Sequence, residues 1–184
     1  MKTDLSSYNN DWYNPGSKIK RALWYLVNEL FLKSSLNPSS KVKILFLKLF
    51  GAYIGEKVII KPNVNIKYPW KLRIGDHCWI GEGVWIDNLD EVTIENHVCI
   101  SQGAFLLCGN HNFKSPSFDL IIKPILLKNG CWIGAKSIVG PGVIVHEHGV
   151  LAMGSAISQD LEPNGIYRGN PAIKIKDRII SSSP

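Results

Sequence analysis

His111 is the side chain in this sequence whose type and setting best suit chemistry. It lies in Gly109-Asn110-His111-Asn112, near the start of a segment that interrupts an otherwise regular repeat. An imidazole titrates near neutrality, so it can take a proton from an alcohol as that oxygen attacks a thioester, and then return the proton to the departing thiolate. We therefore expect His111 to act as a general base in acyl transfer.

The other histidines and the cysteines suit structural places better than chemical ones. His77 and His97 occupy the same place in successive repeats, so their rings could stack about 4.8 Å apart at an outward corner. The cysteines form no CxxC pair and lack the spacing of metal ligands; they are Cys78, Cys99, Cys108 and Cys131. We expect reduced thiols, a cytoplasmic location and no bound metal.

The elements that must position His111 are predicted by a six-residue repeat. From Ile54 onward an aliphatic side chain returns every six positions, and a step of eight after each third repeat makes Ile54, Ile74 and Ile94 recur at twenty. The pattern predicts coils with three flat faces and a bulge at one corner. The aliphatic positions are Ile54, Ile60, Ile66, Ile74, Ile80, Ile86, Ile94, Ile100, Leu106, Leu127, Ile133, Val139, Val145, Leu151 and Ile157.

Small residues support the same pattern. The residue four places after each aliphatic is mostly small or β-branched, which suits a narrow interior. Glycine directly follows several of the aliphatic residues, where we expect sharp corners that are least strained without a side chain. These glycines are Gly55, Gly75, Gly81, Gly134 and Gly140.

The repeat breaks between Leu106 and Leu127, and we expect residues 107–126 to form a loop outside the coils. Loops on a rigid scaffold are frequent places for function. This loop carries His111.

Residues 17–50 have helical spacing instead. One apolar stripe lies between Pro15-Gly16 and Asn37-Pro38, and a second short helix is expected to end at Gly51. The pair could cap the open end of the solenoid, or it could rest on a membrane as a basic amphipathic surface. The stripe consists of Ile19, Ala22, Leu23, Leu26, Val27, Leu30 and Phe31.

Charge and hydropathy limit the kinds of partner that we expect for this protein. The formal net charge is +6, and basic residues crowd into the first third of the chain, which favours an acidic partner. Anionic lipid is one such partner, a solvated basic face is the alternative, and we expect no nucleic acid. No apolar run reaches about 18 residues, and the N-terminus lacks the features of a secretory signal. We therefore predict a cytoplasmic protein whose residues 17–50 could contact the inner face of the membrane.

The repeat, the segment around His111 and the Gly-Asn-Pro-Ala sequence at 169–172 resemble those of the hexapeptide-repeat acyltransferases over about residues 51–176. The resemblance implies a left-handed parallel β-helix, whereas periodicity alone predicts only a parallel β-solenoid. We therefore predict an all-β fold: a helical segment at 1–50, the β-helix at 51–176 and a tail at 177–184. The runs at 86–94 and 100–111 most resemble acetyltransferases of colanic acid and other exopolysaccharide biosynthesis.

The resemblance also implies where the substrates bind. Acetyl-CoA is the expected co-substrate, with its pantetheine arm along the two coils that follow the loop. The residues expected to contact it are Gly134, Ala135, Met153, Ser158, Gln159, Arg168, Lys174 and Lys176. Those expected to contact the acceptor are Trp85, Asp87, Asn88 and Asn110.

The predicted reaction is direct O-acetylation of a sugar hydroxyl in surface polysaccharide biosynthesis. The acceptor would be a sugar or a lipid-linked glycan, and the resemblance implies a homotrimer with sites between subunits. Three alternatives stay open at this point. They are an N-acetyltransferase acting on an amino sugar, a zinc enzyme like the γ-type carbonic anhydrases, and a non-catalytic solenoid scaffold.

Overall fold

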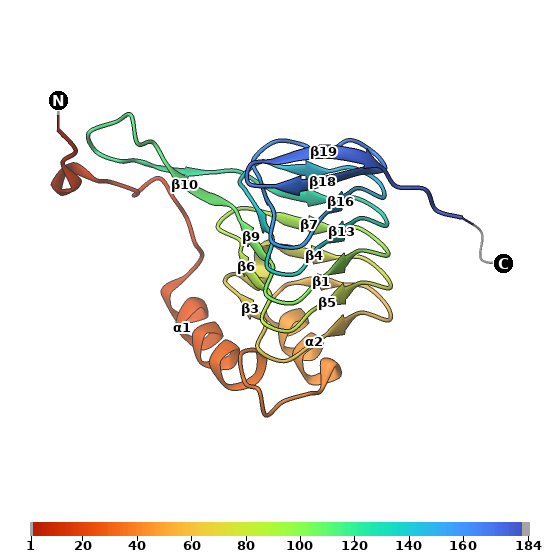
Figure 1. Cartoon of the computed structure of the whole chain (residues 1–184). Helices are drawn as coiled ribbons and strands as arrows, with labels where there is room; N and C mark the ends of the chain where they lie inside the picture. The colour runs from red at the N-terminus through yellow and green to blue at the C-terminus, as the bar shows by residue number, and fades with distance from the viewer. Residues whose placement is uncertain (1, 182–184) are drawn as a thin grey trace.

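The protein is described by a computed structural model over residues 2–181, so the last three residues of the predicted tail lie outside the described residues. A parallel β-helix forms the body, helices pack on its first coil, and a hairpin projects from its side (Figure 1). Each coil contributes one short strand to each of three sheets, as the repeat predicts.

The three sheets are built from strands that pair in parallel with the strand one coil away. Sheet 1 contains β1 (Tyr53–Ile54), β4 (Leu72–Ile74), β7 (Val92–Ile94), β12 (Ile125–Leu127) and β15 (Ile144–Val145). Sheet 2 contains β2 (Ile59–Ile60), β5 (Trp79–Ile80), β8 (Cys99–Ile100), β13 (Trp132–Ile133), β16 (Val150–Leu151), β18 (Gly165–Gly169) and the antiparallel β19 (Ala172–Asp177). Sheet 3 contains β3 (Asn65–Ile66), β6 (Trp85–Asp87), β9 (Phe105–Leu107), β14 (Ile138–Val139) and β17 (Ala156–Ile157).

The core is the column of aliphatic side chains that the repeat predicts. Ile54 pairs with Ile74 and Ile74 with Ile94, which confirms the period of twenty. All of the predicted aliphatic positions are buried, none with more than 4% of its surface exposed. The rings of His77 and His97 stack with centroids 5.0 Å apart and planes 6° apart, as expected of an outward corner column.

The glycines after the aliphatic residues serve a different purpose from the one predicted. None of them has a positive φ; the left-handed residues lie two positions further on, such as His77 at 56° and Gly83 at 67°. At Gly81 an added Cβ would lie 2.8 Å from the backbone nitrogen of Gln102 in the next coil. These glycines therefore allow neighbouring coils to approach closely, and the sharp turns are made elsewhere.

The segment that breaks the repeat is shorter than predicted. Leu107 belongs to β9, and Ile125 and Leu126 belong to β12, so only residues 108–124 leave the coils. This excursion contains the antiparallel hairpin of β10 (Gly109–His111) and β11 (Leu120–Ile122).

Two helices close the first coil. α1 (Lys18–Val27) continues into a π-helical turn (Asn28–Leu32), and α2 (Ser40–Leu49) follows. The Trp24 indole N–H donates to the Ile66 carbonyl at 2.8 Å, and the Ser40 hydroxyl bonds both backbone groups of Ile60 at 3.0 Å. The helices thus satisfy backbone groups at an edge that would otherwise stay unpaired. Among residues 2–181, no helix has the length and apolar character needed to cross a bilayer.

Only part of the predicted apolar stripe faces the coil: Val27 and Phe31 are half-buried against the core. Trp24 and Leu32 are buried, together with Asn28. The stripe's Ile19, Leu23, Leu26 and Leu30 are instead 53–75% exposed. The helix is apolar on two sides, and the side with the indole faces the coil, because there its ring is buried and its N–H finds the Ile66 carbonyl.

The close approach at Gly81 predicts a stability effect. Gly81→Ala should lower the free energy of unfolding by about 3 kcal/mol, because the backbone of the next coil must move. Denaturant unfolding measures the change. Gly154→Ala is the control: its Cβ would meet nothing within 4 Å, so only its φ of 68° opposes the substitution, at about 1 kcal/mol. A smaller loss for Gly81→Ala than for Gly154→Ala would contradict the explanation.

Candidate active site

His111 lies at the end of β10, partly exposed, with its ring stacked on Phe118 from the same excursion. The two ring centroids are 4.5 Å apart and the planes differ by 10°. The Asn110 side-chain oxygen accepts from the His111 backbone N–H at 2.8 Å, which fixes the chain at this point.

The tautomer of the neutral His111 ring follows from one hydrogen bond. Nδ1 lies 2.8 Å from the Phe118 carbonyl oxygen. A carbonyl can only accept, so Nδ1 must carry the hydrogen, and the neutral ring then presents the lone pair of Nε2. This is the tautomer that a general base needs, and the backbone of the excursion maintains it.

The first residues of the chain lie along this excursion, which the sequence did not indicate. Residues 2–16 contain only a 3-10 turn, Leu5–Ser7; we call them the N-terminal arm. The Asp4 N–H donates to the Pro116 carbonyl at 2.8 Å, and the Tyr8 ring lies 6.0 Å from the His111 ring, inclined at 52°. Nearer the body, the Tyr13 hydroxyl donates to the Leu89 carbonyl at 2.8 Å. His111 is therefore held between Phe118 and the arm.

A groove runs across the outer face of sheet 2, from coil to coil, and brings together part of the predicted acetyl-CoA site. Gly134, Ala135 and Met153 line a hollow of about 550 Å³. Within it, the Trp132 indole N–H donates to the Ser101 hydroxyl at 2.9 Å. The exposed backbone at successive coils can pair with an extended chain that bears amide groups.

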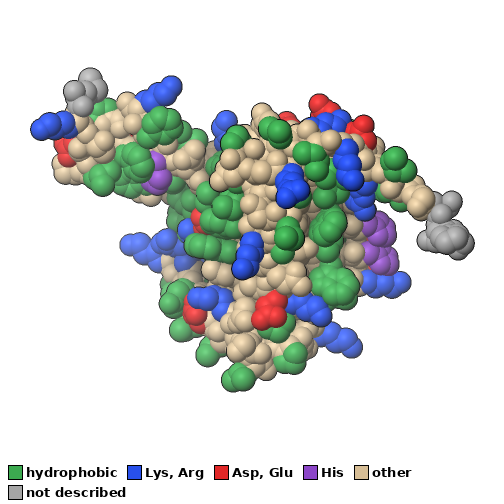
Figure 2. All heavy atoms as spheres, in the orientation of Figure 1, with side chains coloured by type: hydrophobic (Ala, Val, Ile, Leu, Met, Phe, Trp, Pro, Cys, Tyr) green, Lys and Arg blue, Asp and Glu red, His purple; other side chains and the backbone are tan. Residues whose placement is uncertain are grey.

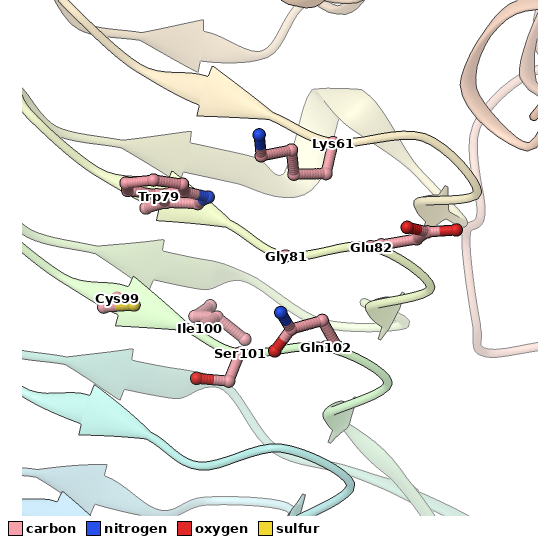
Figure 3. A pocket seen from close by; sticks show the side chains of 8 residues that line it. All are labelled: Lys61, Trp79, Gly81, Glu82, Cys99, Ile100, Ser101 and Gln102. Carbon is pink, nitrogen blue, oxygen red and sulfur yellow. The ribbon is translucent and has the colours of Figure 1, made fainter. Parts of the chain in front are cut away.

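The groove continues into a second hollow of about 510 Å³ that shares Ser101 and Gln102 with the first. Figure 3 shows both of these residues below Trp79 and Lys61, which come from the two preceding coils. The Lys61 ammonium lies 5.2 Å from the centroid of the Trp79 ring.

The other residues predicted to contact acetyl-CoA do not line these hollows. Ser158 and Gln159 follow β17, on sheet 3, and are exposed. Arg168 and Lys176 are exposed on β18 and β19. The Lys174 ammonium is paired with Glu162 and Asp177, each at 2.8 Å, and both hydrogen bonds raise its pKa.

A basic residue that the sequence did not single out lines the groove instead. Arg178 lies beside Trp132 and Ile166, and its guanidinium donates to the carbonyl of Gly130 at 3.0 Å. Arg178 follows β19, and nothing in the sequence there indicates a role in the groove, because only the fold brings this residue back to the coil that contains Gly130.

Of the predicted acceptor residues, Trp85 alone lines a cleft of about 360 Å³ between α1 and sheet 3, whereas Asn110 lies on β10 of the excursion. The ring of Trp85 stacks on that of Phe105, with the ring centroids 4.6 Å apart. Asp87, two residues further along the same strand, forms an ion pair with Lys67 at 2.8 Å, and Lys67 also lines the cleft. From the other side, α1 contributes Arg21 and Tyr25.

Asn88 is placed differently from its neighbours. It is fully buried, its side-chain oxygen accepts from the Tyr68 N–H at 2.9 Å, and its amide donates to the Tyr68 carbonyl at 2.6 Å. Its side chain therefore joins two coils at the corner and does not face the cleft.

All four cysteines are free thiols, and burial is the main influence on their pKa values. Desolvation raises the pKa of Cys108 and of Cys131 to about 12, so neither thiol ionises near neutral pH. Among residues 2–181, no group of three His, Cys, Asp or Glu side chains is placed to hold a metal ion.

A β-helix with a histidine on its excursion and a groove along its coils defines the class of hexapeptide-repeat acyltransferases. No family model matches the chain. It is 36% identical to the colanic acid biosynthesis acetyltransferase WcaF assigned in Escherichia coli K12, over 96% of this chain and 97% of that protein. It is 27% identical to the galactoside O-acetyltransferase of the same organism, over 71% of this chain and 66% of that protein.

Solved structures agree with the fold. A hexapeptide-repeat containing acetyltransferase from Vibrio cholerae superposes with a TM-score of 0.78 at 25% identity, covering 87% of this chain and 91% of that one. The same Vibrio protein has also been crystallised with acetyl coenzyme A. The chain belongs to the hexapeptide-repeat acetyltransferases, in the family of the colanic acid biosynthesis acetyltransferases. It is an acyltransferase with the predicted left-handed β-helix.

The contact between the arm and the excursion predicts a kinetic effect. Tyr8→Ala should lower kcat about three- to tenfold, the range expected for loss of one aromatic contact, because the His111 ring loses a neighbour. Tyr8→Phe should keep the rate, and KM for acetyl-CoA should stay the same in both. Steady-state kinetics measures these quantities.

Trp12→Ala is the matched control for Tyr8→Ala. Trp12 is another aromatic residue of the arm, itself exposed, and its ring contacts Tyr13 instead of His111. Equal losses in the Tyr8 and Trp12 variants, or a fall with Tyr8→Phe, would show that the ring of Tyr8 does not position His111.

Proposed function

We propose that the protein transfers the acetyl group of acetyl-CoA to a hydroxyl of a sugar during assembly of a surface polysaccharide, with His111 as the general base. The observation that carries the proposal is the hydrogen bond from His111 Nδ1 to the Phe118 carbonyl, which leaves Nε2 free to accept a proton. Membership of an acetyltransferase family supplies the donor, acetyl-CoA, and the relatives support a glycan acceptor.

The proposed reaction is a direct transfer. The acceptor oxygen attacks the thioester carbonyl carbon as Nε2 of His111 takes the hydroxyl proton. A carbon–oxygen bond forms, the carbon–sulfur bond breaks, and the proton passes from His111 to the sulfur of CoA. Fixing both substrates removes the entropic cost of their encounter, so the binding surfaces contribute to the rate as well.

The proposed donor site is the groove on sheet 2. Gly134, Ala135 and Met153 would lie against the pantetheine arm, and Arg178 joins them as a cation near the groove. Arg168 and Lys176 are free to meet phosphates, whereas the two carboxylates on Lys174 compete for its charge. Ser158 and Gln159 lie beside sheet 3, so they would contact acetyl-CoA only if another part of the cofactor reached that sheet.

The proposed acceptor site is the cleft between α1 and sheet 3. The Trp85 ring offers an apolar face to a sugar, and the Asp87 carboxylate beside Lys67 offers an acceptor for hydroxyl groups. Asn110, exposed next to His111, would contact the same acceptor. Asn88 would act indirectly, by holding the corner that carries Asp87.

We further propose a homotrimer, in which His111 of one subunit meets a donor held by its neighbour. The excursion and the arm extend away from the coils, so His111 is carried outward from the groove of its own chain (Figure 1). We place the reaction at the cytoplasmic side of the membrane, in keeping with four free thiols and a glycan acceptor built on a lipid.

The acceptor and the base can be tested together. With a panel of sugars, the protein should acetylate hydroxyl acceptors, and His111→Ala should reduce that transfer about 10²- to 10⁴-fold with acetyl-CoA affinity nearly unchanged, as loss of a general base implies. Product analysis and isothermal titration measure the two quantities. Near-normal turnover of His111→Ala would refute its role. Faster transfer to amino sugars would establish the N-acetyltransferase alternative.

A site shared between subunits predicts complementation. His111→Ala and Ala135→Trp should each be inactive, the second because the indole fills the groove. Co-expressed in equal amounts, they should recover about a quarter of normal activity, since random assembly of a ring pairs an intact base with an intact groove at that frequency. Activity of the purified mixed oligomer is the measurement. No recovery in mixed oligomers would place the whole site within one chain.

A further inference from the structure

The outer face of the helical cap consists of exposed apolar side chains and lysines. On α1 and its π-helical turn, Ile19, Leu23, Leu26 and Leu30 lie on one side and are more than half exposed. On α2, Leu45 and Leu49 are 56% and 69% exposed. Leu36, between the helices, is 91% exposed. We call these residues the cap face.

Exposed apolar groups of this kind are unusual when they are contiguous. Single exposed leucines are normal, but a row along one helix is typical of a surface that meets a partner. The side of α1 and its π-helical turn that caps the coil is occupied by Trp24 and Leu32, so the cap face is not part of the buried core. It needs a different explanation.

The charge of the chain is concentrated in the same place. Residues 17–50 contain seven of the 21 basic residues and one of the 15 acidic residues, so this segment accounts for the whole net charge of +6. The rest of the chain carries 14 residues of each sign and is neutral. The segregation is therefore specific to the cap.

The free cations lie beside the apolar side chains. Lys41, Leu45 and Lys48 follow at helical spacing on the exposed side of α2, and Lys18 precedes Ile19 on α1. Lys33 is paired with Glu29 and Lys43 is buried against the Asn37 carbonyl, so these two contribute less. Figure 2 shows hydrophobic and basic side chains side by side over the lower part of the molecule, where Figure 1 places α1 and α2.

We propose that the cap face docks on the surface of a bilayer that contains anionic lipid. The apolar side chains would enter the boundary between headgroups and acyl chains, and the lysines would meet lipid phosphates. This goes beyond the acetyl-transfer proposal, because docking does not depend on which hydroxyl is acetylated.

A second copy of the chain suits the cap face less well. Two cap faces placed together would bring lysines of like charge into contact, and lysine is depleted from the cores of protein interfaces. A bilayer instead supplies negative charge and apolar depth at the same surface. The cleft with Trp85 also lies against α1, so docking would hold that cleft close to the membrane.

The test is flotation of the full chain with vesicles of phosphatidylcholine alone or mixed with phosphatidylglycerol. The protein should float only with the mixed vesicles, and less at high salt, because exposed charges are then screened. Leu23→Gln with Leu30→Gln should abolish binding. Lys41→Gln with Lys48→Gln should weaken it about 20- to 30-fold, the effect expected for two lysines.

Matched controls separate the cap face from general stickiness and charge. Ile179→Gln with Ile180→Gln removes two exposed apolar residues from the end of the described chain, and Lys57→Gln with Lys123→Gln removes one charge from a coil and one from the excursion; both should bind like the unmodified protein. Circular dichroism confirms folding of each variant, and the lysine variant provides the test if the leucine variant does not fold.

Three results would overturn the proposal. They are no flotation with mixed vesicles, equal weakening in the control pairs, and a change of oligomeric state in Leu23→Gln with Leu30→Gln by sedimentation. The last would assign the cap face to a second copy. Flotation does not require turnover, so its failure is distinguishable from failure of the proposed acetyl transfer.

Discussion

The stacking of one coil directly on the next is the constraint from which the other features of this protein follow. Each strand is only a few residues long, so a coil is held by bonds to its two neighbours and by a narrow column of aliphatic side chains. Packing this close excludes even one extra methyl group at Gly81. A scaffold of this kind holds backbone groups at fixed spacing, and that spacing makes its outer face a surface for an extended ligand.

The same regularity explains why the proposed base is carried elsewhere. Within the coils, side chains point either into the filled core or straight out from a flat sheet, so their directions are set by the repeat. An excursion releases His111 from this geometry, and the released segment must then be held again. Phe118 and the N-terminal arm do so, through a hydrogen bond to the ring and contacts from both sides.

The sequence predicted those features that repeat and missed those that depend on contacts far apart in the chain. The aliphatic column and the stacked His77 and His97 follow from period alone. The excursion was located, but its ends were misplaced because apolar residues of β9 and β12 do not differ in type from loop residues nearby. Arg178 and Tyr8 could not be found from the sequence, since only folding brings them to the groove and to His111.

The orientation of α1 shows a limit of pattern analysis that has a physical cause. Helical periodicity identifies apolar sides but does not rank them, and this helix has two. The coil edge selected the side with an indole N–H, because the Ile66 carbonyl would otherwise lie buried and unpaired, at a cost of about 1–3 kcal/mol. The remaining apolar side gains nothing from the fold. Its exposed leucines, next to lysines, are therefore free to meet a surface outside this chain.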